Sequence, residues 1–267
     1  MLRWETAMDT TILILGGSGL AGQALARCLL RESTVQLVLA GRNLTRAEQA
    51  ASALNAQFGE ARVRARYADA ADAASLRQAL SGVKLLLVAS ATTDLTRQVM
   101  QVALDAGVDY LDIQYAPDRW PTLRPMAAQI EQAGLCFVTE AGLHPGLPAV
   151  LVRSAADGFD RIEQALCGIA LFMRGGFPYS SGVDELMLQF ANYRADVYSN
   201  GAWRRADLLT MRDNRTIDFG PPLGRKWCTP ITLHELVDLP AAYPSLHELG
   251  CYVAGFNWFV DWLLTPL

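Results

Sequence analysis

Four glycines fall within seven positions near the start of the chain, between an apolar run and an amphipathic run. The apolar run covers residues 11–15 and predicts a buried strand, whereas residues 20–31 carry apolar side chains at helical spacing. A strand that turns into a helix through glycines can bring its backbone close to a ligand, because no Cβ atom stands in the way. This feature restricts the first half of the chain to a small group of α/β folds.

The same alternation of apolar strand and helix continues to about residue 142. Further strands are expected at 35–40, 63–69, 84–90, 109–113 and 135–142, and helices at 44–58, 72–80, 94–107 and 121–133. Thr45 is a candidate cap for the second helix, and Gly107 is expected to close the fourth. Strands that are apolar on both faces are typical of a parallel sheet covered by helices on both sides. The sequence therefore predicts an α/β fold, a doubly wound Rossmann sheet.

The pattern changes after residue 142. A helix that opens at Pro148 is followed by a strand over 161–172 and a helix over 180–191, and Asn200-Gly201 predicts a β-hairpin. We therefore expect two domains. Residues 1–142, which contain the glycine-rich turn, are expected to form a dinucleotide-binding domain, and residues 143–267 are expected to form a smaller α+β domain for substrate binding or dimerisation. The C-terminal segment is a candidate to pack back on the first domain.

Residues 17–22 match G-x-G-x-x-G, with Gly16 as an additional glycine. We expect Gly17 to allow the tight turn out of the strand, and Gly19 to let a pyrophosphate approach the backbone. Gly22 is expected to let the helix lie close to the sheet. The N–H groups and the dipole of the helix start would then hold the phosphates. The alternative is a tight turn that binds no ligand.

The end of the second strand distinguishes between the two dinucleotides. NAD-binding proteins usually carry a carboxylate there, but residues 40–43 read Ala-Gly-Arg-Asn. Arg42 can pair with a 2′-phosphate, which favours NADP(H) over NAD(H) as the cofactor, unless Arg42 is a solvated loop residue. Asp69, after the third strand, is expected either to contact the adenine edge or to cap a turn.

Ligands of open parallel sheets bind outside the carboxyl ends of the strands. Ser90 and Ala91 should therefore pass beneath the nicotinamide, and Gln114 and Glu140 should lie near the same crevice. The residues that we expect to contact the cofactor are Gly16, Gly17, Ser18, Gly19, Leu20, Ala21, Gly22, Arg42, Asn43, Asp69, Ser90 and Ala91.

Composition excludes several classes of function. The formal net charge is −4 with no long basic run, which argues against nucleic acid as a partner. Five scattered cysteines and three histidines predict no metal site, and indicate reduced thiols in a cytoplasmic protein. Residues 251–267 are apolar but short for a membrane span, so we expect no membrane partner and a buried or oligomer-contacting segment instead. A Tyr-x-x-x-Lys motif is missing from the sequence.

Four stretches together resemble the saccharopine dehydrogenase (saccharopine reductase-like) family. They are GGSGLAGQALARCL (16–29), LAGRN (39–43), AGVDYLDI (106–113) and GLHPGLPAVLV (142–152). The resemblance covers the first 155 residues and implies a dinucleotide-binding domain followed by an α+β substrate domain. It implies reduction linked to NADPH or NADH, often at a C=N bond between amino acids or amines. It also implies that Gly17, Gly19 and Gly22 contact the cofactor.

The same resemblance implies that the turn at residues 144–146 forms the site between the domains. Saccharopine-forming members tend to carry an aspartate where this chain has His144, which argues against saccharopine itself as the substrate. His144 is our candidate proton donor or acceptor, with a turn-capping histidine as the alternative. Tyr115 is a second catalytic candidate, and both Tyr115 and Tyr179 are expected to contact substrate or simply to pack.

We therefore expect an NADP(H)-dependent oxidoreductase that transfers a hydride to or from a small molecule, at a C=N or C=O bond. The alternative is a sensor or regulatory module that binds NADP(H) without turnover, because the sequence contains no firm acid or base. The apolar C-terminus and the strands of the second domain suggest a homodimer.

Overall fold

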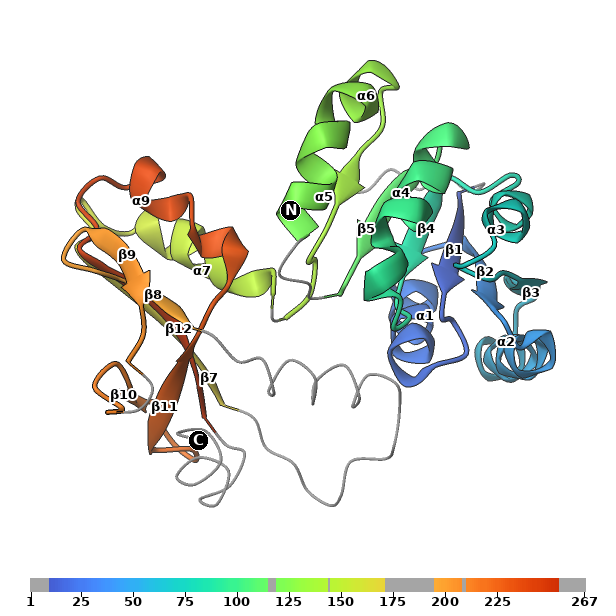
Figure 1. Ribbon diagram of the computed structural model, residues 1–267. Helices are drawn as coiled ribbons and strands as arrows, with labels where there is room; N and C mark the ends of the chain where they lie inside the picture. Colours follow the sequence, from blue (N-terminus) through green and yellow to red (C-terminus); the bar gives the residue numbers. More distant parts are fainter. Residues whose placement is uncertain (1–9, 115–118, 144, 171–194, 208–209, 255–267) are drawn as a thin grey trace. The chain divides into compact units, whose positions relative to one another are not determined.

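The computed structural model describes residues 10–114, 119–143, 145–170, 195–207 and 210–254 (Figure 1). The chain divides into two compact units, Met1–Gly142 and Leu143–Leu267. Each unit is built on its own sheet of β-strands.

A six-stranded parallel sheet forms the first unit, with the strand order β3-β2-β1-β4-β5-β6. The strands are β1 (Thr11–Leu15), β2 (Gln36–Gly41), β3 (Val63–Tyr67), β4 (Leu85–Val88), β5 (Asp109–Asp112) and β6 (Phe137–Val138). The helices between them are α1 (Leu20–Glu32), α2 (Leu44–Phe58), α3 (Ala73–Ala79), η1 (Thr93–Leu95), α4 (Thr96–Asp105), α5 (Arg119–Leu123), η2 (Arg124–Met126) and α6 (Ala127–Gln132). The predicted doubly wound Rossmann fold is confirmed.

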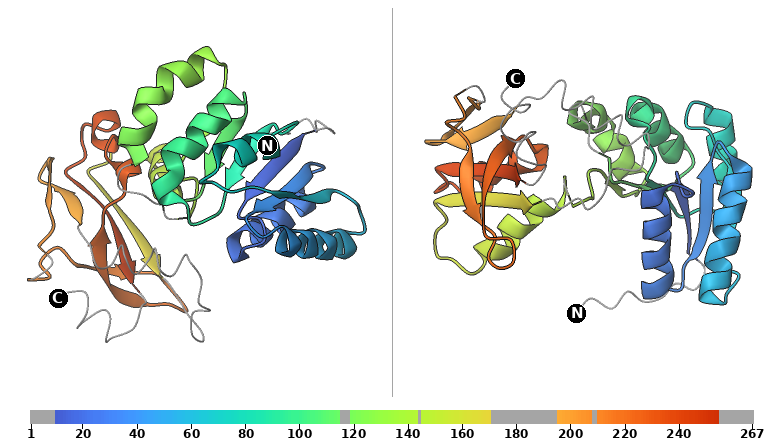
Figure 2. Two further views of the ribbon diagram at one scale, coloured as in Figure 1. Left: turned by 45° about the vertical axis from the view of Figure 1, so that its right-hand side comes forward. Right: turned by 90° about the horizontal axis from the view of Figure 1, so that it is seen from below.

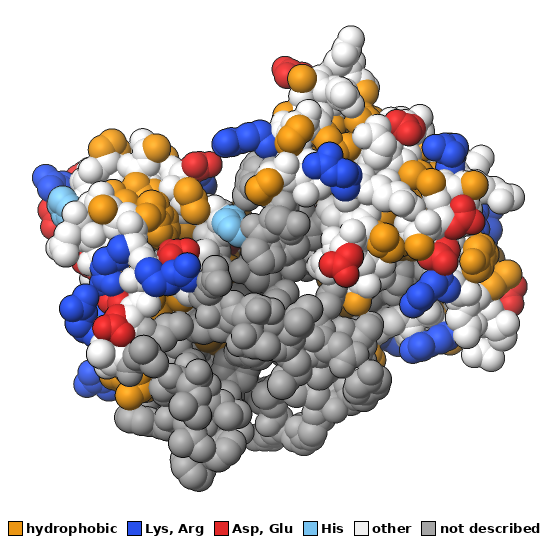
Figure 3. Space-filling model, viewed as in Figure 1, with side chains coloured by type: hydrophobic (Ala, Val, Ile, Leu, Met, Phe, Trp, Pro, Cys, Tyr) orange, Lys and Arg blue, Asp and Glu red, His pale blue; other side chains and the backbone are white. Residues whose placement is uncertain are grey.

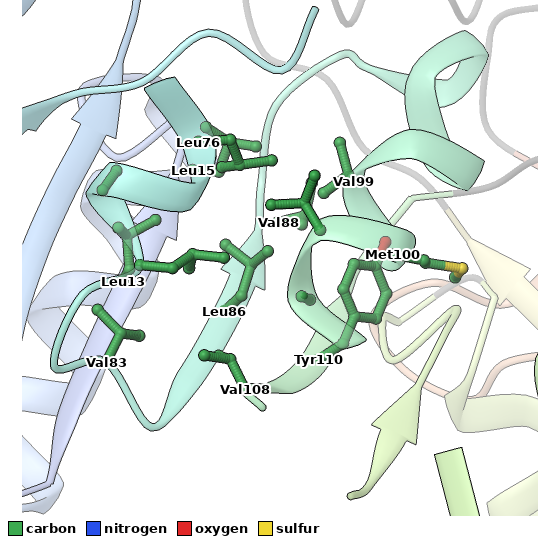
Figure 4. Packing of buried hydrophobic residues seen from close by; sticks show 14 of the residues in the cluster. Leu13, Leu15, Leu76, Val83, Leu86, Val88, Val99, Met100, Val108 and Tyr110 are labelled. Carbon is green, nitrogen blue, oxygen red and sulfur yellow. The ribbon is translucent and has the colours of Figure 1, made fainter. Parts of the chain in front are cut away.

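Helices cover both faces of this sheet because its strands are apolar on both sides. On one face, Leu13 and Leu15 pack with Leu76 of α3 and Val99 of α4 (Figure 4). On the other, Ile12 and Ile14 pack with residues of α1 and α2, which include Ala26, Leu30, Ala47, Ala51 and Leu54. Successive side chains of β1 therefore pack into two different hydrophobic clusters, because neighbouring residues of a strand point to opposite faces of the sheet.

Three local predictions for the first unit need correction. The helix expected over 121–133 is divided into α5, η2 and α6, because Pro125 lacks the N–H that a continuous helix would use. The sixth strand is shortened from 135–142 to Phe137–Val138. The cap of α2 is Asn43 rather than Thr45, since the Asn43 side chain accepts a hydrogen bond from the N–H of Arg46 at 2.9 Å.

A mixed sheet forms the second unit (Figure 2). Its strand order is β10-β11-β12-β8-β9, and β7 pairs with β12 in the parallel direction. Its strands are β7 (Gln164–Ala170), β8 (Asp196–Ser199), β9 (Ala202–Arg205), β10 (Arg215–Asp218), β11 (Arg225–Ile231) and β12 (Glu248–Ala254). Its helices are α7 (Leu147–Ala156), η3 (His234–Leu236) and α9 (Leu239–Ala242). The predicted hairpin is confirmed, because β8 and β9 pair around Asn200 and Gly201, both at positive φ. The helix expected over 180–191 and the segment 255–267 lie outside the described residues.

Charged side chains of both signs are interspersed on the visible surface of each unit (Figure 3). Within the described ranges, no helix is both long enough and apolar enough to cross a bilayer.

Candidate functional site

The glycine-rich turn between β1 and α1 is tied to the neighbouring strand β2. The N–H groups of Gly16 and Gly17 lie 2.8 and 3.3 Å from the carbonyl oxygen of Ala40, and the N–H of Gly19 bonds the carbonyl of Gly16 at 2.9 Å. We expected Gly17 to allow the tight turn out of the strand, and the residue of this turn with a positive φ, 85°, is Gly16. The turn is therefore held by backbone hydrogen bonds at the carboxyl edge of the sheet.

The other glycines of the motif make room for close backbone contacts. A Cβ atom on Gly17 would lie 2.9 Å from Cα of Leu39, so Gly17 packs on β2. A Cβ atom on Gly22 would overlap the carbonyl oxygen of Gly16 and lie 2.7 Å from Cα of Gly17. Gly22 thus lets α1 lie directly against the turn that leaves β1.

Gly19 is the N-cap of α1 and leaves the start of this helix without a side-chain cap. The first N–H groups of a helix have no partner within the helix, and they carry the positive end of its dipole. Among the described residues, a Cβ atom on Gly19 would have one heavy atom within 4 Å, the carbonyl oxygen of Gly16 at 3.1 Å. The site that follows is a bare helix start in a glycine cradle, which fits a diphosphate.

Arg42 and Asn43 follow β2 directly, where α2 begins. Arg42 is exposed, and the first turn of α2 contains no acidic residue. Asp69 follows β3 and uses its carboxylate on the N–H of Ala71, at 3.0 Å. This bond supports the turn-capping alternative for Asp69. Near Arg42, the first turn of α2 carries no acidic side chain that would repel an anion.

Ser90 and Ala91 follow β4, on the side of β1 opposite to β2. A Cβ atom on Gly16 would lie 2.8 Å from Cβ of Ser90, so the glycine turn and the segment after β4 are in direct contact. The Ser90 hydroxyl lies 3.1 Å from that of Thr92. Gln114, after β5, donates its side-chain amide to the Ser90 carbonyl and to the Thr92 hydroxyl. Polar groups from three neighbouring strands thus meet at one edge.

Asp112, the last residue of β5, is buried with 0% of its surface exposed. One carboxylate oxygen accepts the N–H groups of Gln114 and Glu140, both at 3.1 Å. The other accepts the hydroxyl groups of Tyr110 at 2.7 Å and Thr139 at 2.9 Å. Four donors offset the desolvation of a buried carboxylate, and they join the ends of β5 and β6.

A second acidic side chain lies at the start of α7 in the other unit. Glu235 accepts the N–H of Ala149 at 3.2 Å and also that of Gly146. Burial raises the pKa of Glu235 above its ordinary value, and these two hydrogen bonds oppose the increase. Glu235 thus holds the start of α7 at Leu147, three residues after His144 in the sequence. His144 itself, and Tyr115 and Tyr179, lie outside the described residues.

Within the part of the chain that the structure describes, no three His, Cys, Asp or Glu side chains gather as a metal site. Sequence reasoning missed Thr92, Asp112 and Glu235. The polar residues in the otherwise apolar stretch YLDIQ, 110–114, were the available signal for Asp112. Glu235 is far from α7 in sequence and left no comparable signal.

Three comparisons with known proteins agree with this geometry. Residues 12–138 match the family model of the saccharopine dehydrogenase NADP binding domain. The chain is 24% identical over 263 residues to carboxyaminopropylagmatine dehydrogenase of Synechocystis sp., and the match covers 94% of this chain and 64% of that protein. The structure of the present chain resembles apo saccharopine dehydrogenase (L-Glu forming) of Saccharomyces cerevisiae, with a TM-score of 0.70 and 20% identity. That match covers 91% of this chain and 54% of the yeast chain.

The chain thus spans 64% and 54% of the length of these two relatives. The structural match supports the fold, and the family match confirms the prediction of NADP as the cofactor. Over residues 12–138, the chain is similar to the saccharopine dehydrogenase NADP binding domain.

Proposed function

We propose that this protein is an NADP(H)-dependent oxidoreductase of the saccharopine dehydrogenase kind. The observation that carries the proposal is the uncapped start of α1, which lies in its glycine cradle between β1 and β4. The strand order reverses direction at this point, and open α/β sheets bind their ligands there. NADP(H), when bound, supplies or accepts the hydride.

The α1 start would hold the pyrophosphate through the backbone N–H groups of Leu20 and Ala21, because the N–H of Gly19 is already bonded to the carbonyl of Gly16. Leu20 and Ala21 begin a helix that has no side-chain cap, and the dipole adds roughly half a positive charge. Gly16, Gly17, Ser18 and Gly22 would shape the turn around the phosphates.

Arg42 would bind the 2′-phosphate. It is exposed next to the start of α2, whose 15 residues direct their dipole toward the same place. Asn43 fixes that helix start through its bond to Arg46, so its role would be to order the phosphate site. The guanidinium fork of Arg42 suits a phosphate better than any neutral side chain at this position could.

The reaction that we propose is hydride transfer at a carbon–nitrogen or carbon–oxygen bond of a small molecule. The name of the cyanobacterial relative describes agmatine carrying a carboxyaminopropyl group, which favours carbon–nitrogen chemistry. Reduction adds the hydride to carbon and a proton to the nitrogen or oxygen. His144, with Tyr115 as the second candidate, would donate that proton, and the unit from Leu143 would bind the substrate.

Two further properties complete the proposal. The five cysteines would remain reduced thiols in the cytoplasm, and no disulfide joins any of them in the described structure. The second unit would form a homodimer, since Leu147, Val150 and Leu151 of α7 are 37%, 58% and 53% exposed. Light scattering that gives the monomer mass would contradict the dimer.

Calorimetry with NADPH and NADH tests the cofactor site. We expect tighter binding of NADPH, and a loss of about tenfold or more in NADPH affinity for Arg42→Ala, with little change for NADH. Arg31→Ala is the matched control, because Arg31 lies in the last turn of α1, far from the helix start. Equal affinity for NADPH in the wild type and Arg42→Ala would remove the 2′-phosphate assignment.

Oxidation of NADPH in the presence of imines, ketones and enoyl compounds tests the activity. We expect turnover with one of these classes and a severe loss of turnover for His144→Asn, with NADPH binding retained. Tight NADPH binding without turnover on any class would favour the sensor instead.

A further inference from the structure

A clamp of polar groups holds the segment that follows β4. Gln114 is 8% exposed, and its amide nitrogen donates to the Ser90 carbonyl and, at 3.1 Å, to the Thr92 hydroxyl. The Ser90 and Thr92 hydroxyls also contact each other at 3.1 Å. One side chain that follows β5 therefore holds Ser90 and Thr92, on either side of Ala91, after the neighbouring strand β4.

The clamp itself is anchored by Asp112. Its carboxylate accepts the backbone N–H of Gln114 at 3.1 Å, and three further donors hold the same carboxylate in place. The position of Gln114 is thus set by a buried charge that cannot turn without losing several hydrogen bonds. A loop that only connects two elements at the surface needs no buried carboxylate and no such set of hydrogen bonds.

The clamped segment lies directly against the glycine turn. Ala89 and Ser90 would each come within 3 Å of a Cβ atom on Gly16. A dinucleotide that crosses the carboxyl edge of β1 has one half on the β2 side and the other on the β4 side. Arg42 stands on the β2 side, so residues 90–92 stand where the nicotinamide half would lie.

We propose that Gln114, anchored by Asp112, is the residue that positions segment 90–92 for the nicotinamide half of NADP(H). The assignment rests on the proposed function. Gln114 uses its amide donors on the protein, so it acts through Ser90 and Thr92 as a positioning residue. Arg42 and the start of α2 would bind the adenosine half of NADP(H).

Isothermal titration with two ligands separates this role from a general effect on folding. NADPH contains both halves, whereas adenosine 2′,5′-bisphosphate contains only the half on the β2 side. For Gln114→Met, which keeps the volume but loses the amide, we expect NADPH binding to weaken about tenfold and the bisphosphate to bind within twofold of the wild type. Arg42→Ala should instead weaken both ligands.

Gln98→Met is the matched control, because Gln98 also donates its amide to a backbone carbonyl, that of Ala70 at 2.9 Å, away from the clamp. It should leave both affinities unchanged. If Gln114→Met fails to fold, Thr92→Val removes the hydroxyl from the clamp at equal volume and should give the same split between the two ligands.

The outcomes are distinct. Equal weakening of both ligands, or no weakening of either, overturns the positioning role while the proposed function stands. Wild-type protein that binds neither ligand overturns the proposed function and, with it, this assignment.

Discussion

Gly22 packs directly on the carbonyl oxygen of Gly16, with no space between them for a Cβ atom. We expect Gly22→Ala to push α1 away from the turn and to lower the free energy of unfolding by about 1–3 kcal/mol. NADPH binding should weaken as well, because the helix start would move. Urea unfolding and calorimetry measure the two effects.

Gly41→Ala provides the control for this substitution. A Cβ atom there would meet no heavy atom of the described residues within 4 Å, so stability should change little. Equal losses of stability in both variants would contradict the close contact that we describe.

The pair formed by Arg204 and Asp213 should make the second unit sensitive to acid. Arg204 donates two hydrogen bonds to Asp213, at 2.8 and 2.5 Å, and this pairing is the main cause that lowers the pKa of Asp213 from 3.8 to about 2. The unfolded state then binds the proton more readily than the folded state. The resulting stability is present above about pH 4 and is lost as the pH falls toward 2, by roughly 2 kcal/mol.

The measurement is the difference in free energy of unfolding between wild type and Arg204→Met, followed from pH 5 to pH 2.5. We expect this difference to shrink with acid. Arg205→Met is the control, since the Arg205 and Asp196 side chains are 55% and 45% exposed, and its effect should be small throughout. A pH-independent difference for Arg204→Met would refute the linkage.

The contribution of Glu235 to stability should depend on pH in the opposite sense to that of Asp213. Burial is the largest influence on the Glu235 carboxyl group and raises its pKa, despite the N–H groups of α7 that favour the charge. The folded state therefore holds this proton more strongly than the unfolded state, and stability falls as the pH rises through the raised pKa.

The substitution Glu235→Gln keeps a side-chain oxygen that can accept the N–H groups at the start of α7, and it removes the negative charge of the carboxylate. We expect Glu235→Gln to match or exceed the stability of wild type at neutral pH, and Glu235→Ala to be less stable at every pH. Thermal unfolding across pH compares the three proteins. A Gln variant that is as unstable as the Ala variant would show that the charge itself stabilises α7.

The cysteines should differ widely in reactivity. Cys167 faces Cys251 in the register of β7 and β12, and burial raises the pKa of Cys167 to about 11 and that of Cys251 further. Alkylation near pH 8 should therefore modify the exposed Cys28 and Cys136 first. At Cys167 the shift from 9.0 reduces the thiolate about a hundredfold. Mass spectrometry over time measures the order, and early labelling of Cys251 would contradict it.

The parts of the fold that sequence predicts well are those with a local cause. Ile12 and Ile14 alternate with Leu13, so a strand buried on both faces follows from their spacing alone. Asn200 and Gly201 accept positive φ, so the hairpin between β8 and β9 was also predictable. The division of the helix at Pro125 carried a local signal too, but the apolar spacing around it masked that signal.

The site was predictable only in part, for a related reason. The glycine spacing identifies the cradle, yet which glycine takes positive φ depends on how Ala40 holds the turn. The bond from Gln114 to Ser90 joins residues 24 positions apart and depends on β5 pairing with β4. Contacts of this kind depend on the order of the strands in the sheet. The alternation of strands and helices along the sequence does not determine that order.

The strand order also bears on how the chain assembles during synthesis. β1, β2 and β3 are neighbours and are made first, so these three can pair as soon as residue 67 has emerged. The other edge of β1 stays unpaired until β4, which ends at Val88, has been synthesised. We expect this unpaired edge to be the place where a nascent chain stalled between these two points is most prone to self-association.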